Sequence, residues 1–311
     1  MGRRGDLSKE ELKIIIKRIN DEEAFEVFYR DCYLRNLRPA TIDYYKNEFK
    51  AAIKNLNRPL VECEQKDLEE LIINSKKLIK VTTINTRLRA LRSFYNFLYK
   101  NKHLETNPMK NIKLLRDRQK TIETLENKEI ELLIKTIRKQ KTFVGFRDEV
   151  ILLVFLDTGI RLSELIGIEV EDVRDNHIII RKTKNLFERT VYLSETTQEQ
   201  LKRYIKIRGT VGTQKLFINR DDNDLNPHSI QTRFAKYRKE ANISKRVGPH
   251  TFRHTMAKRM IIAGIDAFSL MTLLGHQDMS ITKRYVNLWG PDIERKHEQY
   301  GALKGLKFRR C

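Results

Sequence analysis

Residues 158–165 read TGIRLSEL and directly follow a strongly apolar stretch, residues 147–157. The stretch has the length of a buried helix, and Gly159 is a plausible end for it, because glycine readily adopts the left-handed conformation that closes many helices. Arg161 follows this turn. Glu164 lies one helical turn further on, where its carboxylate can hold the guanidinium. An ordinary ion pair at a helix start would also explain this spacing, so its meaning depends on the rest of the chain.

Around this stretch the sequence predicts a mostly helical domain with one small antiparallel sheet. Two short β-like segments, residues 177–182 and 189–193, are separated by a turn that contains Lys184. Helical periodicity or composition surrounds them. The helices expected here span residues 127–139, 147–157, 197–207, 228–241, 251–263, 267–274 and 280–288.

The N-terminal third predicts a purely helical domain. Apolar residues recur at the spacing of one helix face in residues 21–37, around 42–53, in 64–79 and in 83–99. Apolar residues such as Phe28 and Tyr33 are expected to face inward, Pro39 to end the first helix, and Thr41 to cap the second. The fold class is therefore mainly α, with a helical N-terminal domain and a mostly helical C-terminal domain.

One face of the fourth helix, and the segment after it, are basic. Arg87, Arg89 and Arg92 lie opposite the apolar stripe, which suits a helix resting on a phosphate backbone; an ordinary solvated face is the alternative. Asn107-Pro108 then breaks the pattern, and a polar segment follows that contains Lys113, Arg116 and Arg118. We expect a helical domain at 1–106, a basic linker at 107–122, a second domain at 123–290 and a tail at 291–311.

The net charge favours a polyanionic partner. The 311 residues include 62 Lys and Arg against 41 Asp and Glu, which gives a formal net charge of +21. The excess is found in both halves of the chain, so a basic tail does not explain it. Double-stranded DNA held by both domains is the partner that this distribution predicts.

Several classes of protein are excluded by what the sequence lacks. No apolar run reaches the length of a transmembrane helix, and nothing resembles a signal peptide. Cys32, Cys63 and Cys311 are too few and too widely spaced for a disulfide framework or a zinc site. Glycine-rich nucleotide motifs, H-E-x-x-H and G-x-S-x-G are missing. We therefore expect a cytoplasmic, nucleoid-associated protein that needs no metal and no cofactor.

Three further groups of residues could take part in chemistry. His250 and Arg253 are three residues apart near a helix start, an arrangement that suits a phosphate. Leu273-Leu274-Gly275-His276 is followed nine residues later by Tyr285. Each group alone is weak evidence, and their order along the chain carries the argument.

The chain resembles the tyrosine recombinase (phage integrase) family over residues 123–288. The resemblance rests on the order of five features: TGIRLSEL, a lysine in a strand turn, HTFRH, LLGH and a tyrosine nine residues after LLGH. The N-terminal region resembles that family's core-DNA-binding domain more loosely. The short N-terminus resembles two-domain members of the Xer or mobile-element type. The resemblance implies a site made of the following catalytic residues, with Glu164 supporting the first arginine: Arg161, Lys184, His250, Arg253, His276 and Tyr285. Lys182 is the alternative to Lys184.

The resemblance also implies an assembly. Recombination requires four protomers on two DNA sites, so we expect a homotetramer on DNA and a monomer or dimer off DNA, with accessory proteins as possible partners. Family members pass a C-terminal segment to a neighbouring protomer, and residues 291–311 are the candidate segment. An unbound basic tail is the alternative.

The residue types fit phosphodiester chemistry. Arg161 and Arg253 can neutralise charge on the phosphate oxygens, because arginine stays protonated at any relevant pH. A tyrosine hydroxyl is a weak nucleophile at neutral pH, so Tyr285 needs help, for which His250 is the candidate base. Lys184 is the candidate donor of a proton to the departing 5′ oxygen, and His276 can hydrogen-bond the phosphate. A 3′-phosphotyrosyl link would conserve the bond energy, so resealing needs no ATP. Because arginine, lysine and histidine handle the charge, we expect no metal either.

Two other functions remain open at this point. A type IB topoisomerase shares the phosphotyrosine chemistry but does not exchange strands, and the LLGH motif and the tail disfavour it. A non-catalytic DNA-binding regulator would use residues 267–286 as a helix–turn–helix with Gly275 in the turn. That function leaves Arg161, Lys184 and Arg253 unexplained.

Overall fold

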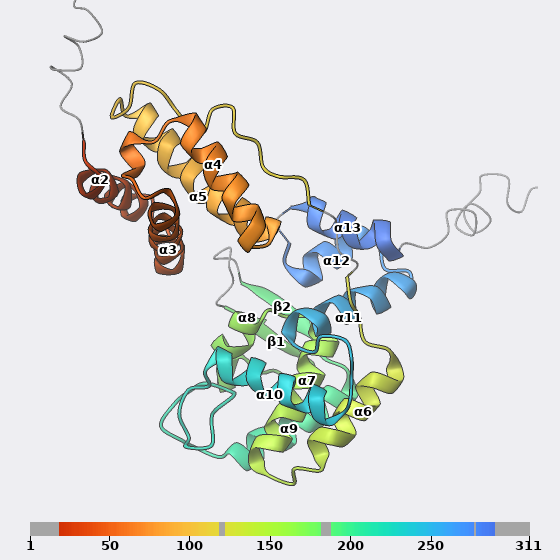
Figure 1. Cartoon of the computed structure of the whole chain (residues 1–311). Helices are drawn as coiled ribbons and strands as arrows, with labels where there is room; N and C mark the ends of the chain where they lie inside the picture. The colour runs from red at the N-terminus through yellow and green to blue at the C-terminus, as the bar shows by residue number, and fades with distance from the viewer. Residues whose placement is uncertain (1–18, 118–121, 182–187, 277, 290–311) are drawn as a thin grey trace, which may run out of the picture. The chain divides into compact units, whose positions relative to one another are not determined.

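The computed structural model describes residues 19–117, 122–181, 188–276 and 278–289. In these ranges α-helices predominate, and the one sheet has two antiparallel strands (Figure 1). The chain divides into two compact units between Lys120 and Thr121. The predicted fold class, mainly helical with a small antiparallel sheet, is confirmed.

The first unit is a helical domain with an aromatic core. Ring centroids of Phe28, Phe49 and Phe94 lie 4.9–5.7 Å apart, at distances typical of favourable aromatic pairs. The buried Tyr95 hydroxyl donates a hydrogen bond of 2.8 Å to the carbonyl of Leu60. The elements of this unit are α2 (Asp21–Leu34), α3 (Pro39–Leu56), the 3-10 turn η1 (Leu60–Glu62), α4 (Gln65–Leu78) and α5 (Val81–Lys100).

Three local predictions for this unit are wrong. The first helix ends at Leu34, and Pro39 begins the next helix, because a first-turn position requires no amide donor. Thr41 consequently lies inside α3, and Arg38 occupies the N-cap position. Tyr33 is 62% exposed, since the helix buries the face that carries Phe28 and Cys32 instead.

The segment after α5 packs onto the same unit. Met109 and Ile112 are buried in its core. The Asn85 side chain donates to the carbonyl of Leu115 and accepts from its amide, at 2.9 and 2.8 Å. The first part of the predicted linker is therefore fixed to α5 as far as residue 117.

The second unit is built around α7 (Phe143–Thr158), whose residues are buried on nearly every side. It packs against α6 (Asn127–Arg138), α9 (Glu195–Arg208) and α11 (Pro249–Ile262), as Figure 1 shows. The other helical elements are α8 (Leu162–Gly167), the turn η2 (Val170–Asp172), α10 (Pro227–Glu240), α12 (Ala267–Leu274) and α13 (Met279–Trp289).

The sheet pairs β1 (His177–Ile180) with β2 (Arg189–Tyr192), in the predicted antiparallel order. Ile178 lies opposite Val191, and both are buried, so one face of the hairpin belongs to the core. The turn predicted to carry the catalytic lysine, residues 182–187, lies outside the described residues.

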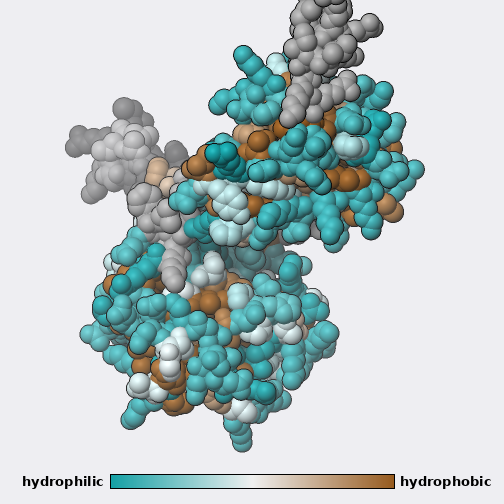
Figure 2. All heavy atoms as spheres, turned by 90° about the vertical axis from the view of Figure 1, so that its left-hand side faces the viewer, coloured by the Kyte–Doolittle hydropathy of each residue, from teal (hydrophilic) through white to brown (hydrophobic). Residues whose placement is uncertain are grey.

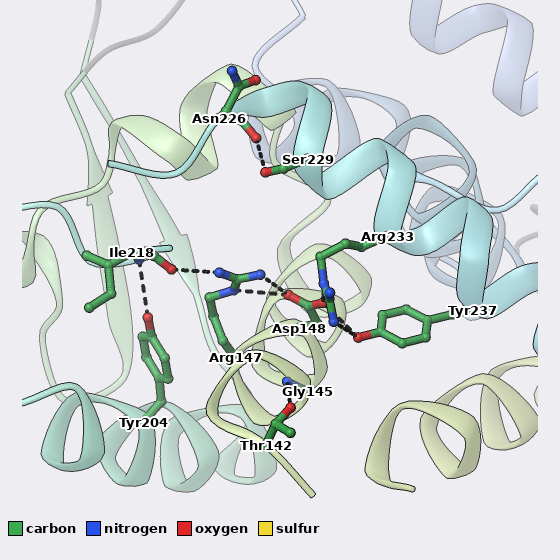
Figure 3. Close-up of polar contacts among 10 residues, drawn as sticks. All are labelled: Thr142, Gly145, Arg147, Asp148, Tyr204, Ile218, Asn226, Ser229, Arg233 and Tyr237. Atoms are coloured by element: carbon green, nitrogen blue, oxygen red, sulfur yellow. Dashed lines mark hydrogen bonds and ion pairs between the residues drawn. The ribbon is translucent and has the colours of Figure 1, made fainter. Parts of the chain in front are cut away.

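A buried ion-pair network ties α7 to α10 (Figure 3). Arg147 and Asp148 are each only 2% exposed. Arg147 donates to Asp148 Oδ1 through Nε and Nη2, at 3.0 and 2.7 Å, and to the carbonyl of Ile218 at 2.8 Å. Asp148 Oδ2 accepts from Arg233 and from the Tyr237 hydroxyl. The network is satisfied within the protein, which identifies it as structural.

Among the described residues, no helix combines the length and the apolar composition that a membrane span requires.

Candidate active site

The TGIRLSEL stretch forms a tight turn between two helices. Gly159 ends α7 with a φ of +61°, as predicted. A Cβ at this position would lie 3.0 Å from Leu274 Cδ2 and 3.1 Å from Met256 Sδ. Glycine is thus required both for the left-handed conformation and for the close approach of α11 and α12. The turn places Arg161 at the N-cap of α8.

Glu164 is the centre of a buried ion-pair cluster. Its side chain is 1% exposed and accepts from Arg161 Nη1 and from Arg189 Nη1 and Nη2, each at 2.9 Å. Burial opposes ionisation of this carboxyl group, but the hydrogen bonds and charges of Arg189 and Arg161 hold its pKa below the ordinary value. The predicted support of Arg161 by Glu164 agrees with this geometry, and Arg189 is a second cation that the sequence interpretation missed.

Replacing Glu164 by glutamine is expected to lower the free energy of unfolding at pH 7 by about 1–3 kcal/mol, because the two guanidiniums lose their counter-charge. The folded pKa is depressed, so the ionised group stabilises the fold above the unfolded pKa and stops doing so as pH falls through the folded value. The difference between wild type and variant should therefore shrink below pH 4.5.

Urea denaturation at pH 7 and at acidic pH measures both effects. Glu199→Gln is the matched control, because that carboxylate is 61% exposed in an i,i+4 pair with Arg203 and should cost little. A difference for Glu164→Gln that is as small as the control at pH 7 would contradict the proposed role of the cluster.

Arg253 is held by the main chain. It is 6% exposed, and its Nη1 and Nη2 donate to the carbonyls of Gly159 and Leu274, at 2.6 and 2.7 Å. Arg161 Nη2 likewise donates to the carbonyl of Gly275 at 3.0 Å. Burial, together with the charge of Arg161, lowers the pKa of Arg253 to about 10. Two guanidiniums are thereby brought together at the ends of α7 and α12, an arrangement suited to a phosphate.

The LLGH motif shapes the same region. Gly275 closes α12 with a φ of +62°, and a Cβ there would meet the Arg189 side chain at 3.1 Å. The next residue, His276, is buried, and its Nδ1 lies 2.8 Å from Thr282 Oγ1. Burial and the charges of the nearby arginines lower the pKa of His276 to about 4. This histidine is therefore neutral at pH 7.

Tyr285 lies on α13 and is 5% exposed. It packs in a small core with Met256 of α11 and Leu270 of α12, and its ring stacks on Trp289 at 5.5 Å. Burial raises the pKa of its hydroxyl above the ordinary value, although Arg253 acts in the opposite direction. The hydroxyl is therefore protonated at neutral pH.

The Tyr285 hydroxyl forms a hydrogen bond with His254, whose Nδ1 is 2.8 Å away. The sequence interpretation instead proposed His250 as the base. His250 lies at the protein surface, and partial desolvation together with the charges of Arg253, Arg246 and Arg161 lowers its pKa. Nothing in the sequence indicated the contact between His254 and Tyr285, because the two residues are 31 positions apart and meet only through the packing of α11 on α13.

Of the predicted catalytic residues, Arg161, Arg253, His276 and Tyr285 occupy one connected region with Glu164. Lys184 and its alternative Lys182 lie outside the described residues. Thr282, the partner of His276, carried no sequence signal. Within the described ranges, no cluster of three His, Cys, Asp or Glu residues has the geometry to hold a metal.

The predicted basic stripe on α5 is divided. Arg87 is buried and paired with Glu48 at 3.2 Å, so its predicted place on an exposed face is wrong. Arg92 is half-buried and donates to the carbonyl of Ile112. Of the other cations predicted to bind DNA, Arg89, Lys113 and Arg116 are exposed, whereas Arg118 lies outside the described residues. In the view of Figure 2, hydrophilic side chains cover most of the visible surface of the described residues, with hydrophobic ones scattered between them.

Comparison with known proteins identifies the family. The model of the phage integrase family matches residues 123–289, and that of the phage integrase N-terminal SAM-like domain matches residues 29–102. The chain therefore belongs to the phage integrase family. It is a tyrosine recombinase, an enzyme that transfers DNA strands, as the sequence predicts.

Individual relatives support this conclusion. The chain is 29% identical over 273 residues to tyrosine recombinase XerC of Syntrophus aciditrophicus, covering 81% of this chain and 88% of that protein. XerC of Thermodesulfovibrio yellowstonii is 28% identical over 275 residues, covering 84% and 88%.

Solved structures share the fold. A lambda integrase dimer bound to a COC′ core site matches with a TM-score of 0.73 and 16% identity, covering 93% of this chain and 83% of that one. The Tn1549 transposon integrase in complex with circular intermediate DNA gives a TM-score of 0.71 with 20% identity, covering 89% and 99%.

Proposed function

We propose that this enzyme cleaves DNA by attack of the Tyr285 hydroxyl oxygen on a phosphodiester. The observation that carries the proposal is the gathering of two guanidiniums, Arg161 and Arg253, beside this tyrosine. The tyrosine oxygen forms a bond to phosphorus, and the bond from phosphorus to the 5′ oxygen breaks. The product is a 3′-phosphotyrosyl link and a free 5′ hydroxyl, and the reverse reaction rejoins the strand.

The residues around Tyr285 suit the separate requirements of this step. Arg161 and Arg253 stabilise the charge that builds on the phosphate oxygens, because they are fixed before DNA arrives. Lys184 is our candidate for protonating the 5′ oxygen, with Lys182 as the alternative. His250 and the neutral His276 are candidates for hydrogen bonds to the phosphate. Because the hydroxyl of Tyr285 is protonated at rest, attack requires a proton acceptor.

We further propose a homotetramer on two DNA sites, and a monomer or dimer without DNA. Support comes from lambda integrase, which has been solved as a dimer on a core site and as a tetramer on a Holliday junction. Residues 291–311, which lie outside the described residues, are the proposed exchanged tail. We propose the bacterial cytoplasm, at the nucleoid, as the site of action. Accessory proteins are possible partners there.

Covalent trapping tests the chemistry. The protein is incubated with a nicked duplex that carries its target site, or with pooled genomic fragments, in EDTA and without ATP. A denaturing gel should show a protein–DNA adduct for wild type and none for Tyr285→Phe, because the phenylalanine ring lacks the attacking oxygen. DNA binding, measured by gel shift, should persist in the variant.

Tyr192→Phe is the matched control, because Tyr192 is 63% exposed on β2, and it should form the adduct normally. An adduct with Tyr285→Phe, or no wild-type adduct on DNA that the protein demonstrably binds, would contradict the proposal. Strand exchange between two sites then separates recombination from topoisomerase activity.

A further inference from the structure

The contact between His254 and Tyr285 joins two helices at the attacking atom. His254 Nδ1 on α11 lies 2.8 Å from the Tyr285 hydroxyl oxygen on α13, and the two rings meet edge to face with centroids 5.6 Å apart. A distance of 2.8 Å is that of a well-formed hydrogen bond. His254 is therefore in direct hydrogen-bond contact with the proposed nucleophile, which also interacts with the Arg253 side chain.

Burial and the charges around the pair keep both partners of this hydrogen bond neutral. Burial and the proximity of His250, Arg253 and Arg284 lower the pKa of His254 to about 4, so its imidazole is neutral at pH 7. The hydroxyl of Tyr285, with its raised pKa, is also neutral. In the tautomer that carries its proton on Nε2, the Nδ1 of a neutral imidazole is an acceptor, and the neutral phenol donates to it. In this tautomer the tyrosine proton points at His254 Nδ1.

We propose that His254 is a further catalytic residue, whose Nδ1 accepts the Tyr285 proton as the tyrosine oxygen attacks phosphorus. The O–H bond of the tyrosine breaks, an N–H bond forms on the imidazole, and the resulting imidazolium returns the proton when the strand is rejoined. The proton for the 5′ oxygen comes from a different group. This inference rests on the proposed role of Tyr285 as nucleophile.

Burial and the same charges keep the proton on the tyrosine in the free protein. Surrounding cations disfavour an imidazolium at His254 in the free protein. A phosphate anion seated beside Arg161 and Arg253 would offset those cations and make His254 a stronger base. The proton transfer is thereby coupled to occupation of the site, and the free enzyme keeps an unreactive tyrosine.

Two substitutions separate proton transfer from positioning. Asparagine places its Oδ1 where Nδ1 stood, so His254→Asn keeps a hydrogen-bond acceptor that cannot be protonated near neutral pH. His254→Ala removes both properties. The measurement is the single-turnover rate of adduct formation on the nicked duplex from pH 5.5 to 9, with folding checked by thermal unfolding. His228→Asn, at an exposed position of α10, is the control.

Both variants are expected to form the adduct at least about 100-fold more slowly at pH 7, the usual contribution of a general base. Their rates should rise about tenfold per pH unit as hydroxide replaces the missing base, a dependence that the wild type lacks on this limb. If His254→Asn reacts at nearly the wild-type rate, His254 only positions the hydroxyl and the proposal is overturned. A uniform loss at every pH also overturns it.

The two proposals fail separately. Loss of the wild-type adduct, or its persistence in Tyr285→Phe, removes the assignment of the nucleophile. A normal wild-type adduct with unaffected His254 variants removes only the role of the histidine. Should His254→Ala fail to fold, His254→Asn still decides the question, because it retains the contact that joins α11 to α13.

Discussion

Replacing Asp148 by alanine is expected to lower the free energy of unfolding of the second unit by about 3–5 kcal/mol, the usual effect of removing one partner of a buried ion pair. Arg147, itself 2% exposed, would keep its bond to the carbonyl of Ile218 but lose its counter-charge. Arg233 and the Tyr237 hydroxyl would lose their shared acceptor. Figure 3 shows that all three donors converge on this one carboxylate.

Urea denaturation followed by circular dichroism measures the change. Asp175→Ala is the matched control, since Asp175 is 99% exposed and lies 3.6 Å from Lys202, and it should alter stability by less than about 1 kcal/mol. A loss for Asp148→Ala no larger than that of the control would show that the network does not stabilise the fold.

Replacing Arg253 by lysine should reduce the rate of adduct formation by at least about 100–1,000-fold, the range found when one fixed donor to a developing charge is removed. Lysine keeps the charge but has a single ammonium group. It cannot bind the carbonyls of Gly159 and Leu274 together while facing a phosphate. The effect should fall on the chemical step, so affinity for DNA should change much less.

Arg259→Lys provides the comparison on the same helix, because Arg259 is exposed and contacts Asn127 rather than the site. Adduct formation on saturating DNA is compared with binding by gel shift. If Arg253→Lys reacts within threefold of wild type, the guanidinium fork is not what stabilises the transition state.

Helix positions were predictable where apolar periodicity is strong. Residues 267–274 are α12 exactly as expected, and the β-hairpin forms where alternation and a turn predicted it. The helix boundaries near Pro39 were not predictable, because a proline is compatible both with the end of one helix and with the first turn of the next. The short helix α8 was also missed as a separate element, since six residues are too few to show a period.

In the candidate active site, residues in local motifs were predictable from the sequence, whereas contacts between distant residues were not. Motifs placed Arg161, Arg253 and His276 correctly in one region, because each lies beside a glycine turn or a helix end that sequence marks. Partners at long range carried no such mark. Arg189 reaches Glu164 across 25 residues, and His254 reaches Tyr285 across 31. Likewise, periodicity placed Arg87 on the exposed face of its helix. The packing of α3 on α5 instead brings Glu48 to it, and the two form an ion pair.

The carbonyls of Gly159, Leu274 and Gly275 have a consequence for how such an enzyme can diverge. A backbone oxygen belongs to no particular side chain, so substitution of the residues around it leaves the acceptor in place. As long as the turns at Gly159 and Gly275 are kept, Arg161 and Arg253 retain these acceptors when surface residues are substituted. The anchoring of Arg161 and Arg253 is thus tolerant of substitution at the residues that supply the carbonyls.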